Sequence, residues 1–370
     1  MPDPAAVVFT ASAGSATRPS AADIRWRWPG AGWLAECVIR AGTTTVGWIC
    51  AAFGLPEIPG AAIIPVRRGA MGRIWRLDLG ADRFAVKELF WEASEESARH
   101  DAEVTAHLEA AGIRLPASVP GPGACFVAQL PGDSGGGWLR LYRWIDGVPV
   151  DLTDPDVATR VGGLLGRLHA CALAPSGEAD PWYDTVPDPA IWDQLADSAL
   201  AHRAPWAAAL AERAGLLREL SAMVTPQAGD PLITSHRDLH PDNVLVDGSG
   251  ELILLDWDDV GPTSPGRELA YVLAAWHVHD GKPDTGAVRR TLAAYQAAGG
   301  PGQIRDEQSF SMLIACMLNF LHTQAGVALD PDAAAGHRQH ACDEISDTLT
   351  RLPTRALITQ LINLAAPLTN

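Results

Sequence analysis

The sequence predicts an α+β fold in which a strand-rich front part precedes a larger helical back part. Short segments of strand composition cluster before Gly147, whereas apolar residues after Gly147 recur mostly at helical spacing. Helices alternate with strands only in the front part, which argues against a doubly wound parallel sheet. Hydrophobic residues make up 47% of the 370 residues and charged residues 19%, so the chain can bury a large core.

The first 64 residues differ in composition from the rest of the chain. Residues 1–22 are rich in Ala, Pro and Ser and predict a flexible tail. Residues 23–64 begin with three tryptophans among apolar residues at mixed spacing, and we interpret them as a helical extension that packs on the next domain. A proline- and glycine-containing break over Pro56–Pro65 ends this extension.

Residues 65–146 predict the smaller domain. Glu95–Ala111 has apolar residues at helical spacing and is followed by Gly112 as a stop signal. A turn at Gly80-Ala81-Asp82 joins the first two of four predicted strands. The strands are Ile74–Leu79, Arg83–Leu89, Phe126–Gln129 and Trp138–Ile145.

Residues 147–370 predict the larger, helical domain. One β-hairpin interrupts it, with Val244–Val246 and Leu252–Leu255 joined by the turn Asp247–Gly250. The predicted helical segments are Asp156–Ala172, Pro189–Val224, Arg267–His277, Gly286–Ala298 and Phe310–Val327.

The charge balance excludes several classes of partner. Lys and Arg total 28 against 44 Asp and Glu, which gives a net charge of −16 and argues against nucleic acid and anionic membranes. The longest apolar stretch, near Val46–Leu55, is about half of the ~20 residues that a membrane span needs. The six cysteines form no CxxC pair, and the start has no basic segment typical of a signal peptide. We therefore expect a cytoplasmic protein with scattered buried thiols.

The segment SHRDLHPDNVLVDGSGELILLDWDD, Ser235–Asp259, carries the main chemical signal. A tight hairpin turn brings Asn243, at the start of its first strand, close to Asp256, at the end of the returning strand. A carboxylate and an amide oxygen together suit Mg²⁺. Asp238, a few residues upstream, lies beside that site as a base for an incoming hydroxyl group. The spacing alone also fits a surface turn with solvated acids.

Lys87 is one of only two lysines among the 28 basic residues. It lies on a predicted strand that follows the glycine-bearing turn Gly69–Gly72, and a compact ammonium suits nucleotide phosphates. Glu103, on the following helix, is placed to orient that ammonium. Each of these features taken singly also fits an exposed strand lysine or an ordinary turn.

With these residues in view, the chain resembles the aminoglycoside phosphotransferase family, small-molecule relatives of the protein kinases. HRDLHPDNVLV…LILLDWDD is similar to the family pattern HGDLHPGNIL…IDWE, and the likeness runs from about Pro65 to His277. It implies a bilobal protein-kinase-like fold, with a small β-rich N-lobe and a larger helical C-lobe. Arg237 replaces a frequent Gly and Glu268 a commoner Asp, but neither removes a group that the reaction needs.

The resemblance implies ATP and Mg²⁺ as cofactors. It gives Asp238 the role of catalytic base, Asn243 and Asp256 that of Mg²⁺ ligands, and Lys87 and Glu103 that of a phosphate-side ion pair. Gly69 and Gly72 match the glycine loop of the family. The strand that ends at Trp144–Gly147 matches the interlobe hinge, where main-chain groups of Arg143 and Ile145 would meet the adenine edge.

The acceptor is expected to be a small molecule that carries a hydroxyl group. Only Trp257–Pro265 separate Asp256 from the next predicted helix, and neither DFG nor APE occurs, so there is no room for a peptide platform. Asp258 and Asp259 would suit an amine-bearing acceptor, an antibiotic such as an aminoglycoside or another amino-sugar or nucleoside antibiotic. An amino sugar, choline or homoserine as acceptor stays open. A nucleotide-binding module without turnover also stays open as a function. The presence of all four groups, Lys87, Asp238, Asn243 and Asp256, favours catalysis instead. The sequence indicates no oligomeric state.

Overall fold

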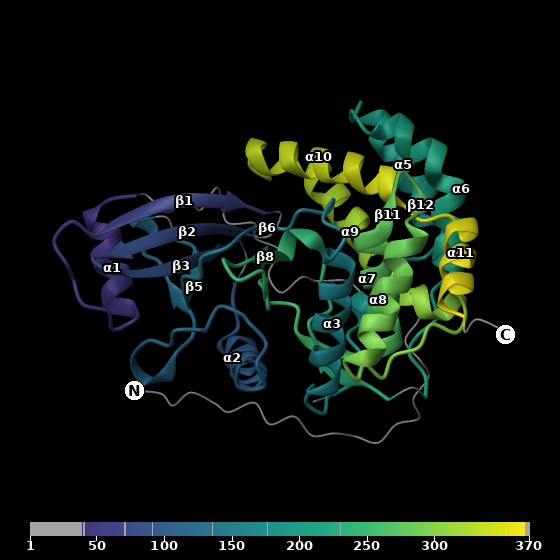
Figure 1. Cartoon of the computed structure of the whole chain (residues 1–370). Helices are drawn as coiled ribbons and strands as arrows, with labels where there is room; N and C mark the ends of the chain where they lie inside the picture. The colour runs from purple at the N-terminus through teal and green to yellow at the C-terminus, as the bar shows by residue number, and fades with distance from the viewer. Residues whose placement is uncertain are drawn as a thin grey trace, which may run out of the picture.

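The computed structural model describes residues 39, 41–69, 72–90, 92–134, 136–175, 177–229 and 231–366. A lobe built on an antiparallel sheet lies beside a larger helical lobe (Figure 1), which confirms the α+β bilobal prediction. The predicted flexible tail over residues 1–22 and the predicted helical extension up to residue 38 lie outside the described residues.

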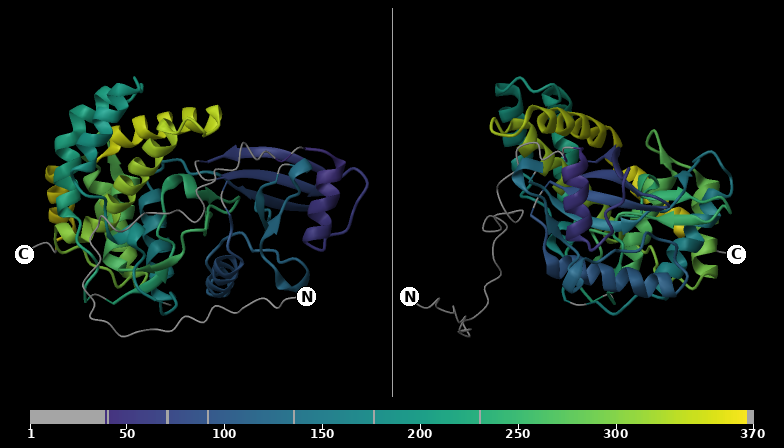
Figure 2. Two further views of the ribbon diagram at one scale, coloured as in Figure 1. Left: turned by 180° about the vertical axis from the view of Figure 1, so that it is seen from behind. Right: turned by 90° about the vertical axis from the view of Figure 1, so that its left-hand side faces the viewer.

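The smaller lobe is built on a five-stranded antiparallel sheet in the order β1-β2-β3-β5-β4. α1 covers one face of this sheet (Figure 2), and its Ile49 shares a core with Trp75, Leu77 and Val86. The lobe consists of α1 (Thr43–Ala52), β1 (Ala62–Arg68), β2 (Gly72–Leu79), β3 (Asp82–Leu89), α2 (Glu95–Ala110), β4 (Ala128–Gln129) and β5 (Trp138–Arg143).

β1 corrects the prediction of a break over Pro56–Pro65. The strand begins at Ala62 and pairs with β2, with an irregularity in register between Pro65 and Arg67. A proline is tolerated because β1 is an edge strand, which leaves one row of main-chain groups without a ladder partner. The proline hid a strand from the sequence analysis.

The predicted hairpin and helix of this lobe are confirmed, whereas the strand predicted over Phe126–Gln129 is only Ala128–Gln129. β2 and β3 pair from Gly72↔Leu89 to Leu79↔Asp82, and Gly80 in the turn has φ +63°. The side chain of Ser94 accepts a hydrogen bond from the Ser97 amide at the start of α2. Gly112, with φ +89°, follows the helix where the sequence places a stop.

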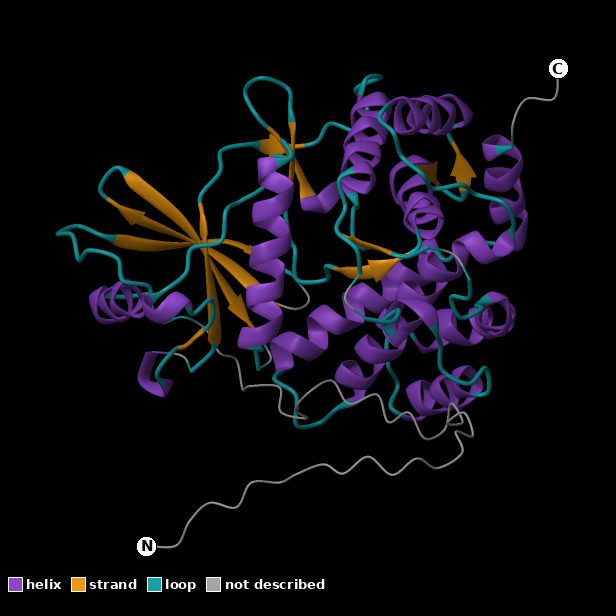
Figure 3. Cartoon of the chain, turned by 90° about the horizontal axis from the view of Figure 1, so that it is seen from below, coloured by secondary structure: helices purple, strands orange, loops and turns teal. Residues whose placement is uncertain are grey.

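The larger lobe is a cluster of helices with a few short strands, on the opposite side of the molecule from the sheet when seen from below (Figure 3). β8 and β9 form the predicted hairpin, and β6 pairs with β8. The hairpin therefore lies in space beside the segment that follows the interlobe connection. The helices are α3 (Val157–Ala170), α4 (Pro181–Asp184), α5 (Ile191–Ala201), α6 (Ala207–Met223), α7 (Pro265–His277), α8 (Thr285–Ala297), α9 (Ser311–Leu329), α10 (Ala335–Arg351) and α11 (Arg355–Ala365). The strands are β6 (Val148–Pro149), β7 (Ile233–Ser235), β8 (Val244–Val246), β9 (Leu252–Leu254), β10 (Gly261–Thr263), β11 (Val278–His279) and β12 (Lys282–Pro283).

α9 is a longer apolar segment than the stretch near Val46–Leu55 that the sequence analysis singled out. Glu307–Leu329 is long and apolar enough to cross a membrane by length and composition, with a mean hydropathy of 1.5, but 56% of that window is buried inside the fold. Leu318 and Leu321 are fully buried, and Asn319 donates to the carbonyl groups of Trp182 and Thr185. These contacts are those of the central helix of a helical lobe.

The described cysteines are free thiols. Only Cys50 among them is buried; Cys125 is exposed, and Cys171, Cys316 and Cys342 are half-buried. The expectation of buried thiols therefore holds for one of these five residues, and Cys37 lies outside the described residues.

His277 makes the stability of the helical lobe depend on pH. The ring is 3% exposed, lies 2.6 Å from the hydroxyl of Thr291 through Nε2, and burial lowers its pKa to about 4. The folded state therefore resists protonation that the unfolded chain accepts near pH 6.5, so stability is lost as the pH falls below about 6.5. We expect wild type to lose roughly 2 kcal/mol of unfolding free energy between about pH 8 and pH 5 through this residue.

Urea denaturation of wild type and His277→Gln at both pH values measures that loss. The variant is less stable at pH 8, because it loses packing, and the difference from wild type shrinks at pH 5. A difference that is independent of pH would contradict the assignment.

Candidate active site

Asp238 lies in the loop between β7 and β8 with both carboxylate oxygens engaged. The hydroxyl of Tyr271 donates to Oδ1 over 2.7 Å, and Nδ2 of Asn243 donates to Oδ2 over 2.8 Å. Burial first, and then the charge of Asp238, raises the pKa of Tyr271 well above its usual value, so the phenol stays a donor. The two donors fix the orientation of a half-buried carboxylate.

His236 joins this loop to the loop after β9. Its Nε2 donates to the carbonyl of Leu255 over 2.8 Å, its Nδ1 accepts from the Asp238 amide over 3.2 Å, and its ring lies edge-on to Trp257. Burial lowers the pKa of this fully buried histidine, so the ring is neutral and can accept and donate at once. Both ring nitrogens are therefore engaged in holding the two loops together.

The hairpin brings Asn243 and Asp256 together as the sequence indicates. The amide of Leu255 donates to the carbonyl of Asn243 over 2.8 Å, and Asp256 follows directly. Asp256 has φ +59°, a conformation unusual for a side chain with Cβ. This left-handed residue ends the strand pairing, and the Asp256 side chain is 42% exposed.

Lys87 reaches across from β3 to these carboxylates. Its Nζ lies 2.5 Å from Oδ1 of Asp256 and 2.7 Å from Oδ2 of Asp258. Burial alone would lower the pKa of Lys87, but the two carboxylates outweigh it and raise the pKa, so the ammonium stays charged. The desolvation of Asp256 is likewise outweighed by Lys87, which lowers the pKa of that carboxyl. Residues distant in sequence therefore meet at one place between the lobes.

Glu103 does not take the predicted position beside Lys87. Its side chain is exposed and lines a groove of about 320 Å³ between α2 and the segment that follows it. Asp101, two residues earlier, is the buried acid of α2 and lies 2.9 Å from Nη1 of Arg140. Two residues turn a helix by about 200°, so the spacing taken from the family pointed to the solvent side of α2.

Arg140, Asp101 and Asp258 are the charged residues that sequence reasoning did not assign to the nucleotide side. Nη1 of Arg140 lies 2.9 Å from carboxylate oxygens of both Asp101 and Asp258. The sequence does contain a signal for Arg140. Side chains two apart on a strand share a face, so Arg140 lies on the same face as Tyr142, within a strand whose neighbouring residues are mostly apolar. Asp101 likewise lies next to Ala102 on the apolar stripe of α2.

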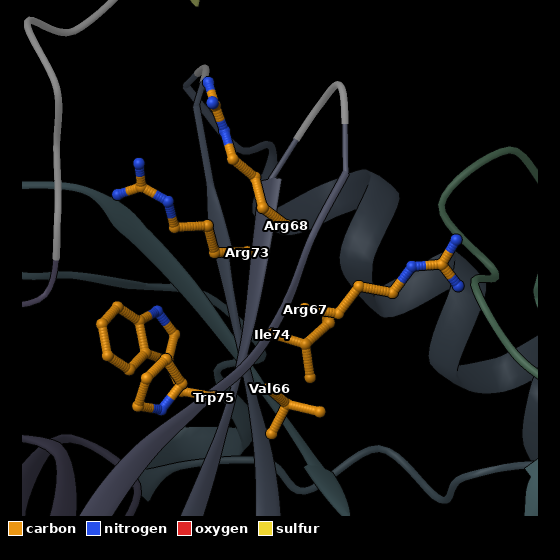
Figure 4. Close-up of a pocket in the computed structure, with 7 residues that line it drawn as sticks. Val66, Arg67, Arg68, Arg73, Ile74 and Trp75 are labelled. Carbon is orange, nitrogen blue, oxygen red and sulfur yellow. The ribbon is translucent and has the colours of Figure 1, made fainter. Parts of the chain in front are cut away.

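Of the two predicted loop glycines at the β1–β2 connection, only Gly72 is required by close packing. A Cβ on Gly72 would lie 2.5 Å from the carbonyl oxygen of Glu88, so only glycine fits there, whereas Gly69 has no such contact. Figure 4 shows Arg67 pointing away from Arg68 and Arg73 at this end of the sheet, beside a pocket of about 320 Å³. Arg67 donates to the carbonyl of Asp242 and so connects β1 to the segment between β7 and β8 that carries Asp238.

The interlobe connection engages some of its main-chain donors and leaves the amide of Ile145 for a ligand. The amide of Arg143 donates to the carbonyl of Ala117 over 2.8 Å, so it is not available to an adenine edge. The amide of Ile145 makes no main-chain hydrogen bond within the described part of the chain. The predicted role of Arg143 is thereby restricted to its carbonyl group.

Arg237 lies on the other side of Asp238, toward the helices. It has φ +67°, its guanidinium carbon lies 4.0 Å from the centre of the Tyr183 ring, and Nε donates to the carbonyl of Asp259. Nη1 lies 3.6 Å from Oδ2 of Asp180. Burial, and then the charges of Asp238 and Asp259, raise the pKa of the Cys316 thiol on α9. Carboxylates outnumber cations here.

A buried hydrogen-bond chain holds Arg237 in this conformation. Oε1 of Glu268 accepts from the Arg237 amide over 2.6 Å, and Oε2 accepts from Nε2 of His169 over 2.8 Å. Nδ1 of His169 lies 2.8 Å from the hydroxyl of Tyr295, which accepts from the Gly302 amide. Burial would raise the pKa of Glu268, but these hydrogen bonds lower it. His169 is thus the hydrogen-bonded core histidine that its leucine-rich helix suggests.

Comparison with known proteins gives a family and a fold. A model of the phosphotransferase enzyme family matches residues 62–306, well over half of the chain. No curated protein matches the sequence. A spectinomycin phosphotransferase in complex with ADP and spectinomycin is similar in structure, with a TM-score of 0.59 at 14% identity over 85% of this chain and 98% of that one.

Two further solved structures share the fold. An amicoumacin kinase in complex with AMP-PNP and Ca²⁺ gives a TM-score of 0.54 at 17% identity, over 86% of this chain and 96% of that one. A choline kinase from Cryptosporidium parvum Iowa II gives a TM-score of 0.50 at 13% identity, over 87% of this chain and 98% of that one. The bilobal arrangement is therefore that of kinases of small molecules.

Removing the Glu268 carboxylate tests the support beneath the loop that carries Asp238. We expect Glu268→Ala to lower the free energy of unfolding by about 3 kcal/mol or more, because it leaves the Arg237 amide and His169 buried without their acceptor. The matched control is Glu307→Ala, which removes an exposed carboxylate paired with Arg355 and should cost much less, because solvent screens that pair. Chemical denaturation measures both, and equal losses would contradict the role of Glu268.

Proposed function

The chain belongs to the phosphotransferase enzyme family, and from this premise we propose that it transfers the γ-phosphoryl group of ATP to a hydroxyl group of a small molecule. One observation carries the proposal. Lys87 from the sheet and Asp256 from the loop after β9 form an ion pair between the two lobes, and Asp238 lies on the neighbouring loop. A cation for phosphates, a carboxylate for a metal and a carboxylate for a hydroxyl group are the groups that phosphoryl transfer requires.

The nucleotide lies under the sheet in this proposal. Ile74 pairs with Lys87 across β2 and β3. Arg76 pairs with Ala85 on one side and with Ile64 on the other, so all of these residues share the face of the sheet that carries Lys87. Ile64 is 39% exposed, an apolar surface that an adenine ring would cover. The amide of Ile145 and the carbonyl of Arg143 are then the hinge groups for the base. ADP and AMP-PNP in the related structures support a nucleotide of this kind.

Asn243 and Asp256 would hold the Mg²⁺ that accompanies ATP. Their donors fit the ion, because Asn243 bonds to Asp238 through Nδ2 and so keeps its amide oxygen, and Asp256 adds a carboxylate oxygen beyond the one on Lys87. Among the described residues no group of three or more His, Cys, Asp or Glu forms a metal site, which fits an ion that takes its other ligands from phosphates and water. When bound, the ion would neutralise charge on the triphosphate.

Asp238 acts as the base in this proposal. The hydrogen bonds from Tyr271 and Asn243 orient its carboxylate, and the acceptor hydroxyl approaches from the side of Arg237 and α9. The carboxylate accepts the hydroxyl proton as the phosphoryl group moves. Lys87 keeps its charge at neutral pH because its partners raise its pKa, so it can bind phosphate oxygens throughout.

An acceptor that carries an amine fits the acidic wall of the site. Oδ2 of Asp180 lies 3.6 Å from Nη1 of Arg237 and the carbonyl of Asp259 accepts from its Nε, so two acidic residues contact one buried cation. We propose an antibiotic of the aminoglycoside or another amino-sugar class as the acceptor. Choline, itself a cationic alcohol, is the second class to test, because a choline kinase shares the fold.

The acceptor can be identified by an ADP-release assay with ATP and Mg²⁺. The panel contains aminoglycosides, nucleoside antibiotics, amino sugars, choline and homoserine, and mass spectrometry of the product follows any stimulation. We expect a cationic acceptor to raise turnover and to gain one phosphoryl group. Stimulation only by neutral acceptors would contradict the amine, and ATP binding without turnover on any acceptor would favour a non-catalytic module.

Replacing the proposed base separates chemistry from nucleotide binding. We expect Asp238→Ala to lower turnover by roughly 10²–10⁴-fold and to leave ADP affinity near the wild-type value, because the base contacts the acceptor. Asp242→Asn, an exposed acid of the same loop, is the matched control and keeps its turnover. An equal loss of ADP affinity in Asp238→Ala would show that the role is wrongly assigned.

The proposed metal ligand predicts how nucleotide binding responds to Mg²⁺. We expect the affinity of wild type for ADP to rise as Mg²⁺ is added, and we expect that rise to disappear in Asp256→Ala because the carboxylate ligand is gone. Isothermal titration calorimetry with ADP at several Mg²⁺ concentrations measures both proteins. A Mg²⁺ dependence in the variant that equals that of wild type would exclude Asp256 as a ligand.

A further inference from the structure

Lys87 and Arg140 stand directly opposite each other on β3 and β5. Like charges at directly opposed positions of an antiparallel pair repel each other, and here both side chains are about nine-tenths buried. A buried pair of cations needs a fixed anion between them. The two side chains therefore need an anion within reach of both, and that anion needs a partner when Lys87 binds phosphate.

Asp258 is the anion between the two cations. Its Oδ2 lies 2.7 Å from Nζ of Lys87 and its Oδ1 lies 2.9 Å from Nη1 of Arg140, and its side chain is 15% exposed. Arg140 is held from the other side by Asp101 of α2, also at 2.9 Å. The charges alternate along one line, from Asp101 through Arg140, Asp258 and Lys87 to Asp256.

The proposed function requires Lys87 to bind phosphate while it contacts Asp256 and Asp258. Lys87 must then share its ammonium between the nucleotide and two carboxylates. Phosphate can compete with Asp258 only if Asp258 keeps a second cation, since a buried carboxylate without a partner is costly. Arg140 is that cation, and Asp101 prevents it from turning away.

We propose that Arg140 is a positioning residue for nucleotide binding: it neutralises Asp258 and so frees Lys87 for the phosphates, with Asp101 of α2 as its anchor. The inference rests on the proposed function. It also explains why Glu103 is not needed beside Lys87, because the link between α2 and the phosphate side runs through Arg140. Arg140 touches neither nucleotide nor acceptor in this scheme and acts through Asp258.

The test is a double-mutant cycle on Arg140 and Asp258, read as affinity for ADP with Mg²⁺ by isothermal titration calorimetry. Arg140→Gln leaves Asp258 with Lys87 as its only cation, and we expect at least about ten-fold weaker binding. Asp258→Asn removes the competitor for Lys87 and binds ADP at least as tightly as wild type. Asp258→Asn combined with Arg140→Gln therefore returns affinity to near the wild-type value.

A purely structural role for Arg140 predicts otherwise, because packing lost on substitution would not return when Asp258 loses its charge. The proposal is overturned if Arg140→Gln binds ADP like wild type or if the double variant stays as weak as the single one. Weakened binding in Asp258→Asn alone would also overturn it, and this variant decides the matter if Arg140→Gln fails to fold by circular dichroism. Arg140→Lys, which keeps the cation, should bind more tightly than Arg140→Gln. If wild type itself binds no ADP, the proposed function fails instead.

Discussion

The ion pair between Lys87 and Asp256 is the contact on which the arrangement of the site depends. It joins the sheet of one lobe to the loop after β9 of the other, and it buries an ammonium that would be costly without its carboxylates. The groups that we propose for phosphate and metal thus neutralise each other in this structure. A ligand with both anionic and cationic parts, such as a nucleotide with its metal, can replace each half of the pair without leaving a buried charge alone.

Two of the five described non-glycine residues with positive φ lie around the same place. Arg237, next to Asp238, and Asp256 both adopt positive φ, and such residues persist where surrounding contacts over-determine them. Glu268 binds the amide of Arg237, and His236 binds the carbonyl that precedes Asp256. Two buried side chains therefore hold two strained loops, which explains why polar residues lie in the core of the helical lobe.

Much of this fold can be predicted from sequence, because local patterns agree with the final pairing. The hairpin after Asn243 needed only a turn and two apolar strands to bring Asp256 near it. The family spacing failed at Glu103, since it gives a sequence distance and not the rotation of α2, whose buried face contains Asp101. β1 was missed because Pro65 argues against a strand until its edge position is known. Neither the partner of Arg140 nor the restriction on the Arg143 amide is encoded locally, because both depend on contacts between elements.

The choice between lysine and arginine at two opposed positions follows from geometry. The chain uses arginine for nearly all its basic residues, yet Lys87 meets two carboxylates that approach a single point. A compact ammonium can do this and later accept phosphate oxygens in their place. Arg140 has to bridge two acids that come from different elements, α2 and the loop after β9, and a planar guanidinium that is always charged suits a fixed bridge. Exchanging the two residue types would keep the net charge but match each set of acids less well, so the pair is specified by shape as well as by charge.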